Sequence, residues 1–342
     1  ALIHTDYTLP PSLGAGVAST LGPTPAHATP NDAQNQRAID AYLKIGLDTI
    51  HPDVTLMWLN DPDGTAHENG VGAPLTRTSL TLVDGGIGRI EDTLRAKGLL
   101  DRTNIIVTSD HGFSTHTGAL ELESLVDPFA KTMADGTKDV VVAEGAIYVR
   151  GASQPARVNA IVAALQRRPE VGAIFTRPAA NAGREGIVPG TLSFDVARWN
   201  HPRSGDILVS ANWTETVNSA GFAGTTTETG IAGHGSSSPF DIHNTLIAAG
   251  PDFREHATSD APTSNVDIAP TLLRLLGLPA APSMTGRVIE EALRNGRAPA
   301  TVTHAEETVS TPDGSYVLTA RISSVAGYRY LDSTRVRRNA RP

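Results

Sequence analysis

The spacing of apolar residues predicts two amphipathic helices in the first third of the chain. Residues 31–48 carry Ile39, Leu43 and Leu47 at intervals of four, so that these side chains share one helical face. Residues 75–97 repeat apolar positions at intervals of three and four, and Gly98 follows as a helix stop. The repeating positions of this second helix are Leu80, Val83, Ile87, Ile90 and Leu94.

Two short apolar runs predict buried strands, each placed directly before a group of polar residues. Residues 54–59 are bounded by Pro52-Asp53 and Asn60-Asp61-Pro62, and residues 104–108 follow the second helix. A repeated order of helix, strand and polar group is typical of a parallel sheet with crossover helices. In such a sheet functional groups gather beyond the carboxyl ends of the strands.

The rest of the chain predicts three parts, which are an inserted subdomain, the last elements of the main sheet and a terminal extension. Residues of about 120–230 mix strand and helix patterns and predict an inserted α+β cap subdomain. A strand at 245–249 and a helix at about 265–276 complete the main core, and residues of about 300–338 predict a terminal hairpin around Asp313-Gly314. The expected fold class is therefore α/β, with a predominantly parallel sheet flanked by helices, in one domain over residues 1–342.

The composition of the chain excludes some kinds of function but does not identify one. The 342 residues have a net charge of −8, which argues against a protein that coats nucleic acid, since that needs a basic face. No stretch approaches the roughly 18 apolar residues of a membrane span. The chain has no cysteine, so a metal ion would have to be held by imidazole and carboxylate.

Two of the polar groups pair an aspartate with a histidine. In Asp63-Gly-Thr-Ala-His67 the two side chains are four residues apart and can converge on one ion in a helix or tight turn. In Asp110-His111-Gly112 the pair is adjacent, and glycine allows the bend that two neighbouring ligands need. Each group taken alone also has an explanation without a metal. The first can be a carboxylate in a turn followed by a surface histidine, and the second can be an aspartate that caps the next segment.

A third group, Gly233-His234-Gly235, places a histidine where the backbone comes close to another part of the molecule. A flexible loop is the alternative, given the serines that follow. Three such groups in one chain, at the ends of predicted strands, make independent chance placement a poor explanation. Neither a Gly-x-Ser-x-Gly elbow nor a phosphate-binding Gly-rich loop competes with this interpretation.

In their order, these motifs resemble the type I phosphodiesterase/nucleotide pyrophosphatase branch of the alkaline phosphatase superfamily. The motifs are Pro62-Asp63-Gly-Thr-Ala-His67, Thr108-Ser-Asp110-His111-Gly112 and Gly233-His234-Gly235. The segments 248–251 and 265–279 are also similar to the closing strand and helix of that family. The resemblance implies an alkaline-phosphatase-like fold and hydrolysis of phosphodiester or pyrophosphate bonds.

The resemblance also implies two divalent metal ions, most simply zinc, with manganese or iron as alternatives. One ion would be held by Asp63, His67 and His234, and the other by Asp110 and His111 together with upstream residues. Two cations a few ångströms apart would neutralise the transferred phosphoryl group. The substrate implied is a small phosphate ester such as a nucleotide.

The nucleophile of the family, a threonine or serine that is transiently phosphorylated, has no counterpart that the sequence identifies. We expect it upstream of Ala1, in an N-terminal part of the same enzyme that would be a partner of this chain. Other activities on the same fold stay open: phosphonoacetate hydrolase, phosphomonoesterase or sulfatase, or a non-catalytic metal-binding fragment. The family favours a secreted or periplasmic location.

Overall fold

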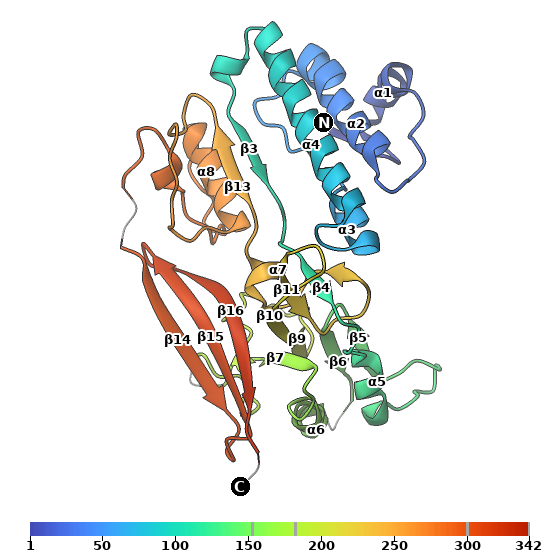
Figure 1. Cartoon of the computed structure of the whole chain (residues 1–342), viewed down its shortest axis with the longest axis vertical. Coiled ribbons are helices and arrows are strands. Elements are labelled where there is room, and N and C mark those ends of the chain that lie inside the picture. Colours follow the sequence, from blue (N-terminus) through green and yellow to red (C-terminus); the bar gives the residue numbers. More distant parts are fainter. Residues whose placement is uncertain (152–153, 181–182, 299–300, 341–342) are drawn as a thin grey trace. The chain divides into compact units, whose positions relative to one another are not determined.

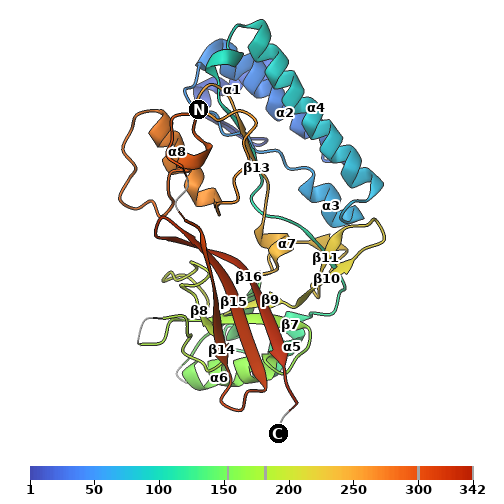
Figure 2. The same cartoon turned by 60° about the vertical axis from the view of Figure 1, so that its left-hand side comes forward.

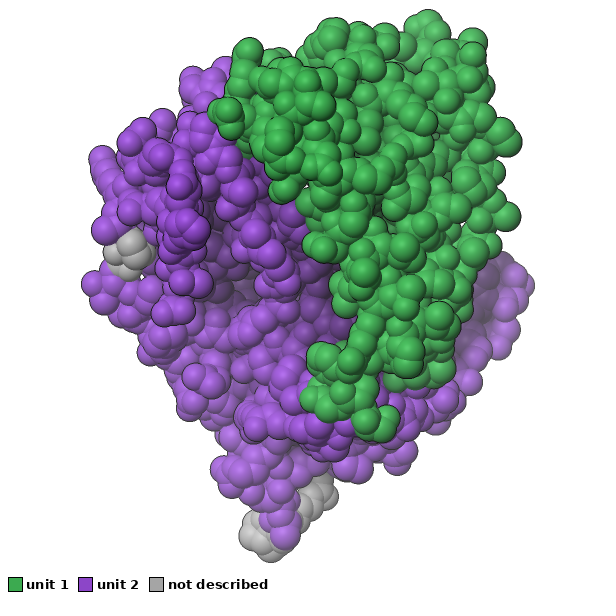
Figure 3. All heavy atoms as spheres, turned by 45° about the horizontal axis from the view of Figure 1, so that its top comes forward, with its two compact units in different colours: residues 1–104, 219–222, 231–233 green, residues 105–218, 223–230, 234–342 purple. Residues whose placement is uncertain are grey.

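A computed structural model describes residues 1–151, 154–180, 183–298 and 301–340. The chain divides into two compact units, coloured separately in Figure 3. Unit 1 contains residues 1–104, 219–222 and 231–233, and unit 2 contains residues 105–218, 223–230 and 234–342.

Unit 1 is mainly helical, as the apolar periodicity of its sequence predicts. Its elements are β1 (Leu2–Ile3), β2 (Thr8–Leu9), η1 (Pro11–Leu13), α1 (Gly14–Leu21), α2 (Asp32–Ala41), η2 (Tyr42–Ile50), α3 (Asp63–Asn69), α4 (Pro74–Ala96), η3 (Leu100–Arg102) and β12 (Ala232–Gly233). Both long predicted helices are confirmed, the first as α2 continued by the π-helical η2 and the second as α4 (Figure 1).

Helices α2 and α4 pack closely against each other because α4 has a glycine at the point of contact. A Cβ atom added at Gly86 of α4 would come within 2.4 Å of Ile39 Cδ1. Ile39 has no exposed surface. Beside this contact, Arg89 of α4 forms an ion pair of 2.6 Å with Asp40 of α2. The apolar stripe predicted around Ile39 is therefore the face by which α2 joins the core of unit 1.

The predicted strand at residues 54–59 is wrong. The segment has no regular secondary structure, and within the described residues none of its backbone groups makes a hydrogen bond. Its alternate side chains face solvent, with Leu56 90% and Trp58 67% exposed. An apolar run becomes a strand only when a neighbouring strand takes up its N–H and C=O groups, and none does here.

The inserted part of unit 2 is a five-stranded sheet with a helix on it. Its strands are β5 (Val140–Ala143), β6 (Ala146–Val149), β7 (Val171–Thr176), β8 (Leu192–Ser193) and β9 (Ile207–Ala211), in the order β5-β6-β9-β7-β8. The accompanying helices are α5 (Leu122–Val126), η4 (Asp127–Phe129) and α6 (Gln154–Leu165). Every residue of β7 is buried, as in a central strand.

The C-terminal residues form a three-stranded antiparallel sheet of β14 (Thr303–Ser310), β15 (Tyr316–Val325) and β16 (Tyr328–Arg338), drawn in red in Figure 2. The two segments expected to form a hairpin lie in β15 and β16, and β14 adds a third strand. This sheet shares one hydrophobic core with the inserted sheet. Buried Tyr316 secures the contact by donating a hydrogen bond from its hydroxyl to the Gly172 carbonyl at 2.7 Å.

The remaining strands of unit 2 include the one that precedes Asp110. They are β3 (Ile105–Thr108), β4 (Ser114–His116), β10 (Trp213–Val217), β11 (Ala223–Thr226) and β13 (Leu246–Ala249). The helices here are α7 (Pro239–Ile242), η5 (Asn265–Asp267), α8 (Ile268–Leu275) and η6 (Glu290–Ala292). The expected strand before Asp110 is confirmed as β3.

The α/β class is as expected, whereas the strand directions differ from the expectation of a mostly parallel sheet. Parallel pairing occurs between β11 and β4 and between β7 and β8. Strands β3 and β13 pair antiparallel, as do β5 with β6 and the strands of the C-terminal sheet. Short turns join several of these strands, and a short turn permits only antiparallel pairing.

One ion pair joins the inserted sheet to α6. The Arg157 guanidinium donates two hydrogen bonds of 2.8 Å to the Asp139 carboxylate. It donates two more to the carbonyls of Arg150 and Phe129. The Arg157 hydrogen bonds and one from the Lys131 amide lower the pKa of Asp139 from 3.8 to about 2.

We expect Asp139→Asn to lower the stability of the protein at about pH 5 and to have a smaller effect at about pH 2.5. Because the folded-state pKa lies below the unfolded value, the carboxylate stabilises the fold above that unfolded value, and its contribution is lost as the pH falls toward the folded pKa. The urea unfolding midpoints of the wild type and of Asp139→Asn, taken at both pH values, measure this difference in stability. Asp127→Asn, in the exposed pair with Lys138, is the control and should shift the midpoint little at either pH. A constant difference for Asp139→Asn would contradict the assignment.

Candidate metal centre

In unit 1 the Asp63 and His67 side chains lie on one face of α3, one helical turn apart. His67 Nε2 is 3.4 Å from Asp63 Oδ1. The other ring nitrogen, Nδ1, lies 2.9 Å from the Ala232 carbonyl oxygen, which belongs to the same unit. A carbonyl only accepts, so Nδ1 carries a proton, and Nε2 lies on the side of the carboxylate. A histidine ligand of a metal ion is commonly oriented in this way.

In unit 2 the Asp110-His111 pair repeats this arrangement on a different backbone. His111 Nε2 is 3.3 Å from Asp110 Oδ2, and His111 Nδ1 is 2.9 Å from the Gly112 carbonyl oxygen. The chain bends at Asp110. Gly112 lies at a close contact, where a Cβ atom would be 2.1 Å from the Phe240 carbonyl oxygen, so that only glycine fits there.

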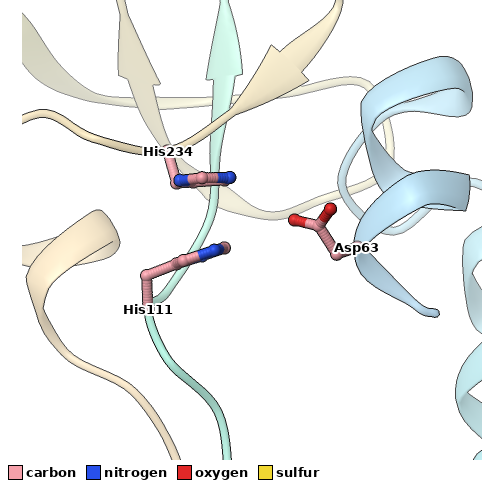
Figure 4. A group of neighbouring side chains, drawn as sticks. All are labelled: Asp63, His111 and His234. Atoms are coloured by element: carbon pink, nitrogen blue, oxygen red, sulfur yellow. The ribbon is translucent and has the colours of Figure 1, made fainter. Parts of the chain in front are cut away.

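His234 lies against His111 in the same unit. The ring centroids are 3.3 Å apart and the planes differ by 16°. Figure 4 draws the two rings facing each other. Imidazole nitrogen is a common ligand of divalent metal ions. Figure 4 also draws Asp63 of α3, and these three side chains are of the types that hold a divalent cation.

The loop after β3 is fixed by an amide side chain that the sequence did not single out. Asn265 donates from its side chain to the carbonyls of Ser109 and Asp110, at 3.1 and 3.0 Å. The sequence indicated only a helix beginning near Asn265. Its role in holding the Asp110 backbone depends on a contact across 155 residues, which no local pattern reveals.

The loop after His234 is fixed by a carboxylate. Ser236 donates to Asp241 Oδ2 from its backbone nitrogen at 3.0 Å and from its hydroxyl at 2.6 Å. Asp241 is 3% exposed. The serines after Gly235, which left a flexible loop open as an alternative, are therefore tied into the interior of unit 2.

A second carboxyl group that the sequence did not single out is Glu228. Burial raises its pKa to about 7, and the charge of Asp241 adds to this effect, while His234 opposes it. This carboxyl therefore changes its charge close to neutral pH. His116 places its Nδ1 2.6 Å from the carbonyl oxygen of Thr229, the residue that follows Glu228.

Comparison with known proteins assigns the family. The family model described as type I phosphodiesterase/nucleotide pyrophosphatase matches residues 23–236, a region that contains Asp63, His67, Asp110, His111 and His234. The chain belongs to this family. The resemblance stated from the motifs is thereby confirmed.

Two curated members of the nucleotide pyrophosphatase/phosphodiesterase family match over most of this chain. A mouse protein named bis(5'-adenosyl)-triphosphatase enpp4 is 26% identical over 247 residues, covering 69% of this chain and 47% of that protein. Human ectonucleotide pyrophosphatase/phosphodiesterase family member 5 is 23% identical over 267 residues, covering 75% of this chain and 49% of that protein. The chain thus spans about half the length of these relatives.

Solved structures with a similar fold include members of two hydrolase groups. Murine ectonucleotide pyrophosphatase/phosphodiesterase 5 superimposes with a TM-score of 0.51 at 21% identity, covering 76% of this chain and 63% of that one. The alkaline phosphatase PafA superimposes with a TM-score of 0.50 at 17% identity, covering 67% of this chain and 45% of that one. The fold is therefore α/β and alkaline-phosphatase-like. Among the described residues, no helix combines the length and apolar character needed to cross a membrane.

Proposed function

We propose that this nucleotide pyrophosphatase/phosphodiesterase homologue hydrolyses phosphodiester or pyrophosphate bonds in nucleotide-like substrates, using two divalent metal ions, most simply zinc. The observation that carries the proposal is the repeated aspartate–histidine pair. In each pair a backbone carbonyl fixes the Nδ1 proton and Nε2 lies beside a carboxylate oxygen. A carboxylate next to a neutral nitrogen lone pair is unfavourable unless a cation or a proton lies between them.

The ligand sets that we propose follow the family motifs. Asp63, His67 and His234 would hold one ion, while Asp110 and His111 would provide half of the second set. The bound ions would offset the negative charge of the phosphoryl group and lower the pKa of an oxygen nucleophile. The chain itself has a net charge of −8, so the cations would supply the local positive charge that an anionic substrate needs.

The nucleophile of the proposed reaction is a threonine or serine hydroxyl in a part of the enzyme upstream of this chain. Its oxygen would form a bond to phosphorus as the leaving-group oxygen departs, and water would then cleave the phosphorylated side chain. One relative supports a threonine: murine ectonucleotide pyrophosphatase/phosphodiesterase 5 was solved with AMP as an inactive variant in which a threonine is replaced by alanine.

The segment 54–59 supports the proposal that an upstream part completes the fold. Its alternate side chains Val54, Leu56 and Trp58 are exposed, which is the pattern of one face of a strand without its cover. Residues 54–59 are of types that favour a β-strand, but no neighbouring strand pairs with them. An upstream strand beside this segment would supply both hydrogen bonds and apolar cover.

The substrate class is tested by comparing a bis-aryl phosphate diester with the matching aryl phosphate monoester, using the enzyme that includes its upstream residues. We expect the diester to be hydrolysed with the higher kcat/KM, and we expect a chelator to abolish the activity. A preference for the monoester, a phosphonate or a sulfate ester would favour a phosphomonoesterase, phosphonoacetate hydrolase or sulfatase on the same fold. Retained activity after metal removal would contradict the metal-dependent mechanism.

We further propose a secreted or periplasmic location, supported by the name of the ectonucleotide pyrophosphatase/phosphodiesterase relatives. Detection of the native protein outside the cytoplasm by cell fractionation would test it.

A further inference from the structure

The carboxylate of Asp61 is buried and is surrounded by hydrogen-bond donors. Its exposed fraction is 2%. Asp61 Oδ2 accepts hydrogen bonds from the Asn31 amide at 2.6 Å, the Thr65 hydroxyl at 2.7 Å and the Ser79 hydroxyl at 3.1 Å. Asp61 Oδ1 accepts one from the Thr65 amide at 3.1 Å. All these residues belong to unit 1.

These hydrogen bonds fix the first turn of α3, which carries the proposed ligands. The helix begins at Asp63 after Pro62, whose side chain offers no cap. The amide of Thr65 is one of the N–H groups that a helix leaves without an intrahelical acceptor. Asp61 supplies that acceptor from just outside the helix, in the manner of a capping side chain. Thr65, held by two hydrogen bonds, lies midway between Asp63 and His67.

The loop that contains Asp61 is also anchored to α2 by Asn35, which is 3% exposed. The Asn35 side chain donates to the Asp61 carbonyl at 3.3 Å and accepts from the Asn60 amide at 3.0 Å. Ser79 connects the same carboxylate to α4. The start of α3 is therefore tied to α2 through the backbone of Asp61 and to α4 through its carboxylate.

The stability of the fold alone does not explain why an aspartate occupies position 61. A buried carboxylate is costly to desolvate, and neutral donors compensate for it less well than a cation does. Among the described residues no lysine, arginine or histidine forms an ion pair with Asp61. A carboxylate does, however, provide two oxygens that accept in fixed directions, whereas an amide provides only one.

We propose that Asp61 is a positioning residue for the metal centre, which sets the orientation of α3 so that Asp63 and His67 bind one ion. The role rests on the proposed function, because it requires that these two residues are ligands. Asp61 itself does not bind the ion. Hydrogen-bonding partners of metal ligands typically change metal affinity by about 10- to 100-fold when they are replaced, and we expect an effect of this order for Asp61, which holds the helix that carries two ligands.

The test measures zinc affinity by competition with a chromophoric chelator, together with the melting temperature, for four proteins. These are the wild type, Asp61→Asn, Thr65→Val and Leu94→Ala. In Thr65→Val the hydroxyl is lost while shape and backbone amide are kept. Leu94 is buried in the same unit, near the opposite end of α4 from Ser79, so its replacement lowers stability without touching the carboxylate.

We expect Asp61→Asn to weaken zinc binding by about 10- to 100-fold and Thr65→Val to weaken it by a smaller factor. Leu94→Ala should melt earlier and bind zinc as the wild type does. Wild-type affinity in Asp61→Asn would overturn the positioning role, and if that variant does not fold, the same result in Thr65→Val would do so. Equal weakening in Leu94→Ala would also overturn it, because the effect would then follow stability. A wild-type protein that binds no zinc would instead overturn the proposed function, and the positioning role with it.

Discussion

Replacing His234 with alanine is expected to remove one equivalent of bound metal and to reduce diester hydrolysis by about 1000-fold. A metal ion that polarises a phosphoryl oxygen contributes several kcal/mol to transition-state stabilisation, and about 1.4 kcal/mol corresponds to a factor of ten in rate. Asp63→Ala should have the same effect, because we propose that both side chains hold the same ion. Metal content is measured by elemental analysis and activity with the bis-aryl phosphate.

His256→Ala is the matched control for these variants. His256 is an exposed histidine that lies outside every proposed ligand set. Its replacement removes an imidazole without affecting the ions, so metal content and activity should both stay at the wild-type level. Equal zinc in the His234, Asp63 and His256 variants would refute the proposed ligand assignment.

Local patterns in the sequence predicted the elements whose formation depends on local contacts. Helix α4 follows from its apolar spacing, and the strand before Asp110 follows from a short apolar run that β13 completes. Residues 54–59 carry an equally clear strand pattern and nevertheless stay without a partner. Strand formation depends on a neighbour that can be far away in sequence, and the run itself does not contain that information.

The proposed ligands were identified from their residue types, while the residues that hold their backbone segments were not. Asp61 and Asn265 are ordinary polar residues near turns or helix starts, and such residues are frequent in any chain. Their importance comes from contacts with segments distant in sequence, such as Asn31 at the start of α2 or Asp110 after β3. A single sequence therefore identifies candidate ligands more readily than the structure that supports them.

The 342-residue chain alone is expected to bind metal and to hydrolyse the diester at no more than the background rate, whereas the enzyme extended by its upstream residues should be active. Within this chain the second proposed ion has only Asp110 and His111 as ligands, and a zinc site needs at least three protein ligands. In the proposed mechanism the hydroxyl nucleophile also comes from the upstream part, and loss of a nucleophile can cost on the order of 10⁶-fold in kcat. Kinetics of both proteins on the bis-aryl phosphate measure the difference.

Two further measurements make this comparison decisive. The extended enzyme carrying His234→Ala should lose the activity, which ties turnover to the proposed metal centre. If an upstream strand covers residues 54–59, Trp58 should become less accessible to acrylamide in the extended enzyme. A Trp58→Phe variant separates its signal from Trp199 and Trp213. Full diesterase activity from the 342 residues alone would contradict the upstream nucleophile, because this chain would then have to supply that hydroxyl itself.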